Sequence, residues 1–136
     1  MPIECISKDN KVLAMVIREK PPSQGVRFFT PDDYSLQVGK HFHRGGTVIK
    51  PHCHFPVKVT KNASLNEVLY IEKGKVKVNF YTKDGGKIDS VILNSGDLIL
   101  LMEGGHGFEF LEETKMIEIK EGPFIAESKK KIDVKK

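Results

Sequence analysis

The sequence has no tryptophan, only two cysteines and no apolar run long enough to cross a bilayer. Cys5 and Cys53 cannot supply a disulfide framework, so the chain must rely on a hydrophobic core, and 136 residues are enough for one domain. The N-terminus also lacks the basic and then apolar stretch of a secretion signal. These absences together predict a cytoplasmic protein with no membrane partner.

A basic stripe interleaved with aromatic residues is missing as well. The net charge is +4, but residues 129–136 hold five lysines and one aspartate and account for all of it, so the remaining chain is neutral. A basic terminus of this kind is typical of a solvated tail, and we expect no nucleic-acid partner. The sequence therefore predicts one domain over residues 1–128, followed by a lysine-rich tail over residues 129–136.

No stretch has the spacing of an amphipathic helix, whereas short β-rich runs recur between glycine, proline and Asn/Asp clusters. This pattern is typical of an all-β sandwich or barrel with little helix. Turns are expected at residues 83–86 and 94–97, where glycines permit chain reversal. Beyond Gly122 the β pattern ends, which predicts a surface segment or a short terminal helix. Strands are expected at 11–18, 26–29, 36–44, 47–53, 66–73, 75–82, 88–93, 97–102, 106–111 and 115–120.

Two strands place an ionisable side chain on an apolar face. Glu67 shares its face with Leu69 and Ile71, and His106 shares its face with Phe108. Burying a carboxylate or an imidazole is costly unless another group satisfies it. A metal ion would do so, and a direct Glu67–His106 ion pair is the alternative.

A pair of histidines strengthens the metal interpretation. His52 and His54 are two residues apart, and an extended strand directs both imidazoles to the same face. With Glu67 and His106 they would supply three nitrogens and one oxygen, a set that suits divalent iron, manganese, nickel or zinc.

These residues follow the first motif of the cupin superfamily, G-x5-H-x-H followed by E-x6-G. Five residues separate Gly46 from His52, His54 follows, and six residues separate Glu67 from Gly74. Twelve residues, 55–66, replace the short gap within the motif. Gly96-Asp97 and His106 resemble the second motif, with the histidine one position early. Met102 stands at the motif's proline and Phe110 at its asparagine.

The resemblance covers about residues 35–121 and implies a double-stranded β-helix, or jelly-roll, barrel. It also implies that His52, His54, Glu67 and His106 bind a divalent transition metal. Cupins with this ligand set include dioxygenases and sugar or keto-acid isomerases, so we expect a small polar or anionic substrate. Two alternatives stay open, namely a non-catalytic cupin that binds a small ligand or serves as an accessory subunit, and a metal-free sugar-nucleotide isomerase.

Residues outside the motifs suggest further contacts. The insertion at residues 55–65 is expected at the pocket mouth, either as a solvated loop or as a lid that presents Lys58 or Lys61 to an anion. His41 and His43 form a second His-x-His pair with no carboxylate at a matching spacing. We interpret them as strand residues at the barrel rim, where His43 is a candidate substrate contact.

Two strands are apolar on both faces. The run 12–17 reads Val-Leu-Ala-Met-Val-Ile, and the strand 97–102 has leucines or isoleucine on each side. A strand in so small a protein is covered on both faces only if something outside the barrel packs against it. For the strand at residues 12–17 we expect a second copy to provide that cover, so the sequence predicts a homodimer, whereas the strand 97–102 is expected only to be covered on both faces.

Overall fold

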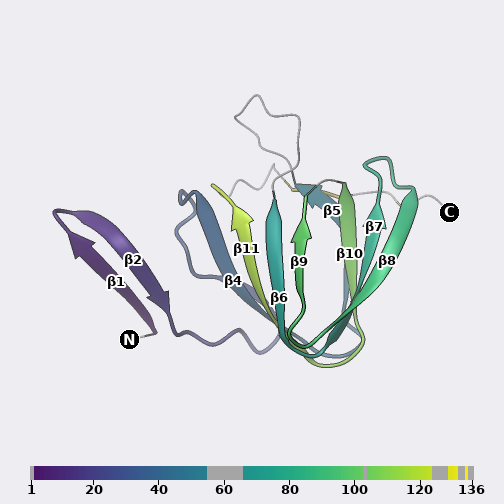
Figure 1. Cartoon of the computed structure of the whole chain (residues 1–136), viewed down its shortest axis with the longest axis horizontal. Coiled ribbons are helices and arrows are strands. Elements are labelled where there is room, and N and C mark those ends of the chain that lie inside the picture. Colours follow the sequence, from purple (N-terminus) through teal and green to yellow (C-terminus); the bar gives the residue numbers. More distant parts are fainter. Residues whose placement is uncertain (1, 55–65, 103, 124–128, 132–133, 135–136) are drawn as a thin grey trace.

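The computed structural model describes residues 2–54, 66–102, 104–123, 129–131 and 134, with the side chains of residues 53, 54 and 129–131 outside the description. Every regular element in these ranges is a β-strand (Figure 1). The strands are β1 (Ile3–Lys8), β2 (Lys11–Ile17), β3 (Gly25–Phe28), β4 (Leu36–His43), β5 (Val48–His54), β6 (Glu67–Lys73), β7 (Lys75–Tyr81), β8 (Lys87–Asn94), β9 (Leu98–Leu101), β10 (Gly105–Phe110), β11 (Thr114–Glu121) and β12 (Lys129–Lys131).

Two five-stranded antiparallel sheets form the barrel. One has the order β12-β5-β10-β7-β8 and the other has the order β3-β4-β11-β6-β9, so neighbouring strands are often distant in sequence. Both sheets turn apolar side chains inward, as alternation along the strands requires. The all-β jelly-roll prediction is confirmed. The core contains Leu69, Ile71, Val76, Val78, Leu93, Leu101, Phe108, Phe110 and Met116.

All ten predicted strands are present, with ends that differ by at most one residue. The predicted turns also form, since Thr82 N–H donates to Gly86 O at 2.8 Å and Asp97 N–H donates to Asn94 O at 3.0 Å. Two strands were not predicted. β1 pairs with β2 through a turn at Asp9 and Asn10, whose φ values are 53° and 62°. Asx residues tolerate this left-handed conformation, so the turn needs no glycine.

The second unpredicted strand lies in the lysine-rich tail. Lys129, Lys130 and Lys131 pair antiparallel with residues 54, 53 and 52 of β5. The expectation that the β pattern ends at Gly122 is therefore wrong for these three residues, which form a strand. Their backbone supplies hydrogen-bonding groups to the edge of β5, which would otherwise end the sheet unpaired.

The β1–β2 hairpin forms a sheet of its own and projects from the barrel (Figure 1). In the described part of the chain, no helix has the length and apolar character needed to span a membrane.

Candidate functional site

The site begins where β5 and β10 pair across one sheet. His52 and His106 are directly opposite in the antiparallel register. Their ring centroids are 4.6 Å apart with an interplanar angle of 72°. Only 7% of His52 and 6% of His106 is exposed, so both imidazoles lie in the barrel interior. A narrow cross-strand pairing thus brings together two histidines that are 54 positions apart in the sequence.

The ring of His52 is oriented by its own strand. Its Nδ1 lies 3.0 Å from the carbonyl oxygen of Lys50, which can only accept a hydrogen bond. Nδ1 therefore carries the proton, which makes Nε2 the nitrogen that would bind a metal ion. A backbone carbonyl that fixes the tautomer in this way is the usual companion of a metal-binding histidine.

Glu67 approaches the histidines from the other sheet. It is the first residue of β6, only 3% exposed, and its Oε1 lies 3.8 Å from Nε2 of His106. That separation is longer than a hydrogen bond between these two atoms. Two ligand atoms bound at about 2.0–2.2 Å to one ion are roughly 3–4 Å apart, so the spacing fits shared coordination.

Three of the four predicted ligands therefore meet in the interior, namely His52, Glu67 and His106. The backbone of His54 belongs to β5, but its side chain lies outside the description, so its role stays a prediction. Within the described residues, no group of three or more His, Cys, Asp or Glu side chains stands in a complete metal-binding arrangement. Lys58 and Lys61 also lie outside the described residues.

A cavity of about 100 Å³ opens beside this group. It contains His52 and Glu67 together with three polar residues absent from the predicted set, His41, Glu118 and Lys120. The rest of the wall is apolar and comes from both sheets. The apolar lining residues are Val26, Phe28, Ile49, Leu69, Phe108 and Met116.

A chain of hydrogen bonds leads from the cavity into the core. Oε1 of Glu118 on β11 accepts a hydrogen bond from Nε2 of His41 on β4 at 2.7 Å. Nδ1 of His41 is in turn 2.9 Å from Nε2 of His43. His43 stacks on Phe110 with centroids 4.1 Å apart and is 4% exposed. His41 and His43 are thus interior residues, and their predicted position at the barrel rim is wrong.

The sequence analysis found no carboxylate partner for His41 because Glu118 is 77 positions away. The sequence contained one signal. Glu118 lies at the same two-residue spacing as Thr114 and Met116 on β11, so the three side chains share the inward face of that strand. An acidic residue on the inward face of a strand needs a partner. The β4–β11 register, which pairs Met116 with His41, brings that partner within reach.

Two residues of this hydrogen-bonded series, Glu118 and His43, have shifted pKa values. Burial acts to raise the pKa of Glu118, but the hydrogen bond and charge of His41, with further contributions from Lys120 and Glu67, lower it to about 2. Burial, and then the neighbouring His41, lowers the pKa of His43 to about 4. At neutral pH Glu118 is therefore a carboxylate and His43 is a neutral ring.

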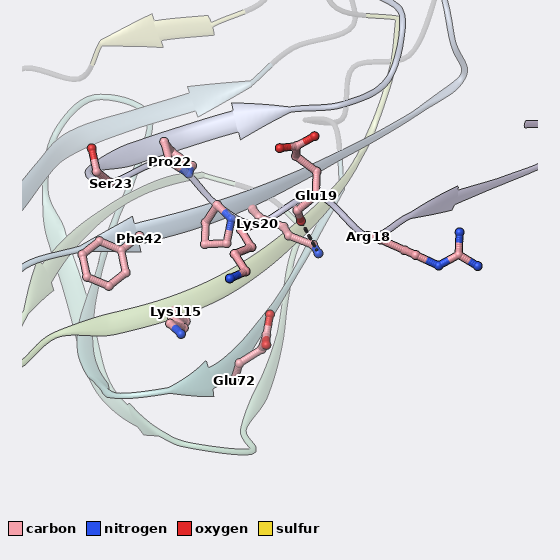
Figure 2. Close-up of a pocket in the computed structure, with 10 residues that line it drawn as sticks. Arg18, Glu19, Lys20, Pro22, Ser23, Phe42, Glu72 and Lys115 are labelled. Atoms are coloured by element: carbon pink, nitrogen blue, oxygen red, sulfur yellow. Dashed lines mark hydrogen bonds between the residues drawn. The ribbon is translucent and has the colours of Figure 1, made fainter. Parts of the chain in front are cut away.

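A larger pocket lies on the outside of the barrel, away from this chemistry. Its volume is about 520 Å³, and it separates the segment 18–23 from the outer face of the sheet (Figure 2). Lys20, Lys115 and Glu72 border it, while Arg18 extends away and pairs with Glu4 at 2.7 Å. None of the described residues that line it is buried, so the small interior cavity with its buried ionisable groups is the better candidate for a reactive site.

Comparison with solved structures agrees with this architecture. Oxalate decarboxylase from Bacillus subtilis matches with a TM-score of 0.62 and 19% identity over 82% of this chain. A cupin superfamily protein from Desulfitobacterium hafniense matches with a TM-score of 0.57 and 13% identity over 78% of this chain. A cupin-2 domain protein from Shewanella frigidimarina gives a TM-score of 0.52 and 16% identity over 71%.

The chain has the cupin fold. The resemblance drawn from Gly46, His52, Glu67 and Gly74 is thereby confirmed at the level of architecture. The chain corresponds to 29% of the oxalate decarboxylase chain, but to 84% and 79% of the Desulfitobacterium and Shewanella proteins. No protein-family model and no curated protein matches the sequence.

Proposed function

We propose that this cupin binds one divalent transition-metal ion through His52, Glu67 and His106, with His54 as the fourth ligand. The observation that carries the proposal is the convergence of two buried imidazoles and a buried carboxylate from three strands. Three such groups are costly to remove from water together, and coordination offsets that cost.

Several details support the fit. The carbonyl of Lys50 directs the lone pair of His52 to Nε2, and the His106–Glu67 separation of 3.8 Å suits two ligands of one ion. Three imidazoles and a carboxylate suit iron, manganese, nickel or zinc. Oxalate decarboxylase, which shares this fold, contains Mn(II) centres. We therefore include Mn²⁺ among the ions to be tested.

We further propose that the site acts on a small polar or anionic molecule. The cavity of about 100 Å³ has room for a molecule of only a few heavy atoms, since one water takes about 30 Å³ of the liquid. Lys120 lines the cavity, but its Nζ lies 4.0 Å from Oε2 of Glu118, so the attraction for an anion comes from the bound ion and Lys120 together. The bound ion would supply Lewis-acid or redox chemistry.

Metal analysis of untagged protein purified without chelators tests the proposal. We expect one ion per chain in the wild type, and loss of that ion in His52→Ala, Glu67→Gln and His106→Ala. His43→Phe is the matched control, because His43 is equally buried but does not line the cavity. The proposal also predicts a higher Tm when the ion is added, with about 2.7 kcal/mol of stabilisation at one hundred times Kd. The proposal would be overturned if the wild type contained no stoichiometric metal and its Tm did not rise with any of the four ions.

A metal-free acid–base site is the second candidate, because Glu118 and His41 form a buried pair in the wall of the same cavity. Turnover of a panel of small carboxylates and sugar phosphates separates these functions. Activity that a chelator abolishes and the ion restores supports the metal enzyme. Activity that survives the chelator but is lost in Glu118→Gln supports the metal-free site, and binding without turnover supports a ligand-binding cupin.

A further inference from the structure

The outer face of the sheet β3-β4-β11-β6-β9 is apolar, although its inner face already covers the core. The strand registers align Val38, Ile119, Val68 and Leu100 in one outward row across β4, β11, β6 and β9. The adjacent row consists of Lys40, Ile117, Tyr70 and Leu98. An antiparallel sheet with one solvated face normally carries polar residues there.

Four of these eight residues are exposed in the single chain, and the other four are half-buried. Leu98 is 66% exposed, Leu100 is 55% exposed, and Tyr70 and Ile119 are 37% and 38% exposed. The sequence predicted that the strand 97–102 is covered on both faces, but within the described residues its outward leucines remain open. This outer face therefore needs a contact surface that the described residues of one chain do not provide.

The β1–β2 hairpin, here called the arm, has the same property. Its register places Ile3, Cys5, Met15 and Ile17 on one face and Ile6, Ala14 and Val16 on the other. Leu13 is 66% exposed and Ile6 is 49% exposed. A lone two-stranded hairpin is at best marginally stable in water, so the arm needs a surface to pack against.

The arm is directed away from the outer face of its own barrel. The segment 18–23 runs along that face, where Lys40 Nζ donates a hydrogen bond to the backbone oxygen of Glu19 at 2.7 Å (Figure 2). Pro21 and Pro22 follow and restrict the backbone. With its base held in this way, the arm extends beyond the edge of the barrel (Figure 1).

We infer that two copies of this chain exchange arms, so that the arm of each copy packs on the apolar outer face of the other. The chain carries both complementary surfaces, and a reciprocal exchange about a two-fold axis covers each outer face with the arm face that holds Ile3, Cys5, Met15 and Ile17. Packing of one sheet on another also suits their shapes. This inference is independent of the proposed metal site.

The available area agrees with a stable dimer. The exposed fractions of Val12, Leu13, Tyr70, Leu98, Leu100 and Ile119 range from 37% to 66%. Large side chains present on the order of 150 Å² each, so these six leave on the order of 450 Å² of apolar surface per copy. Backbone and half-buried neighbours add to this, and a stable dimer buries about 800 Å² per partner.

Light scattering coupled to size exclusion tests the inference on the full chain. We expect twice the one-chain mass of 15.3 kDa for the wild type. Leu13→Glu on the arm and Leu98→Glu on the outer face should each halve the observed mass. Ile88→Glu is the matched control, because Ile88 is 65% exposed but lies on β8 in the other sheet. A monomeric wild type, or a dimer that tolerates both variants, would refute the exchange.

Cross-linking tests the contact without relying on a destabilising charge. With Cys53 replaced by serine, Cys5 on the arm should link to a cysteine introduced as Leu98→Cys or Leu100→Cys, yielding a covalent dimer with a short bismaleimide. Ile88→Cys should give no such link through its new thiol. A covalent dimer that joins Cys5 to Cys5 alone, in every variant, would show that the arms meet each other instead and would overturn the inference.

Discussion

Replacing Glu118 by glutamine should reveal the energy stored in its contact with His41. The substitution keeps the shape of the side chain and removes its negative charge. The pKa of Glu118 falls from 4.5 to about 2 in the fold. At 1.36 kcal/mol per pKa unit, ionisation of this carboxyl contributes up to about 3 kcal/mol to the free energy of unfolding. We therefore expect Glu118→Gln to lose about 2–3 kcal/mol at pH 7, because His41 loses its charged acceptor in a buried setting.

The dependence of that loss on pH makes the prediction specific. A carboxyl whose pKa is lowered by folding stabilises the protein fully above its unfolded value of 4.5 and progressively less as pH falls toward 2. The difference between wild type and variant should thus shrink to about 1 kcal/mol at pH 3. Mutation of a surface carboxylate, as in Glu113→Gln, should change the free energy by less than about 0.5 kcal/mol at any pH.

Urea unfolding in the presence of a chelator, at several pH values from 7 to 3, measures this difference directly. The chelator keeps any bound ion from contributing to stability through Glu67, which also interacts with Glu118. If Glu118→Gln is as stable as the wild type at pH 7, or if its deficit is the same at pH 3 as at pH 7, the charge of Glu118 does not stabilise the fold.

Urea unfolding at several pH values also tests the role of His43, and alanine substitution at two glycines tests the backbone. His43 has a pKa of about 4 in the fold against 6.5 ordinarily, so the unfolded chain gains a proton first and stability should fall as pH drops from 6.5 to 4. His43→Phe should flatten that part of the pH profile, and an unchanged slope would contradict the assignment. Gly74→Ala should lower stability by at least about 3 kcal/mol, because φ is +120° and the added Cβ would lie 2.6 Å from the carbonyl oxygen of Glu113. Gly46→Ala, with φ of +91° and open space, should cost only about 1 kcal/mol, and equal Tm losses in the two variants would refute the crowding argument.

Strand positions were predictable from the sequence because local alternation and turn residues determine them. Leu69 and Ile71 alternate with exposed residues on β6, and glycines mark the turns at residues 83–86 and 94–97. β1 was not predicted because its turn uses Asp9 and Asn10 rather than glycine. β12 was not predicted because its three lysines have little β propensity and pair with β5 through their backbone.

The site was predictable only in part for a related reason. The spacing of His52, Glu67 and His106 matched a motif, so their convergence followed from the fold that the motif implied. The Glu118–His41 contact depends on the register between β4 and β11, which no local pattern encodes. Contacts between distant strands of this kind become visible only when the sheets are assembled.

The attachment of Lys129–Lys131 to β5 links the C-terminus to the strand that carries His52 and His54. A chain shortened at residue 128 would leave that strand at the sheet border, free to shift its histidines or to recruit a strand from another molecule. Purification tags and fluorescent fusions are therefore better attached at the N-terminus when the histidine strand is under study. The backbone of residues 129–131 thus supports the strand that holds the proposed metal ligand His52.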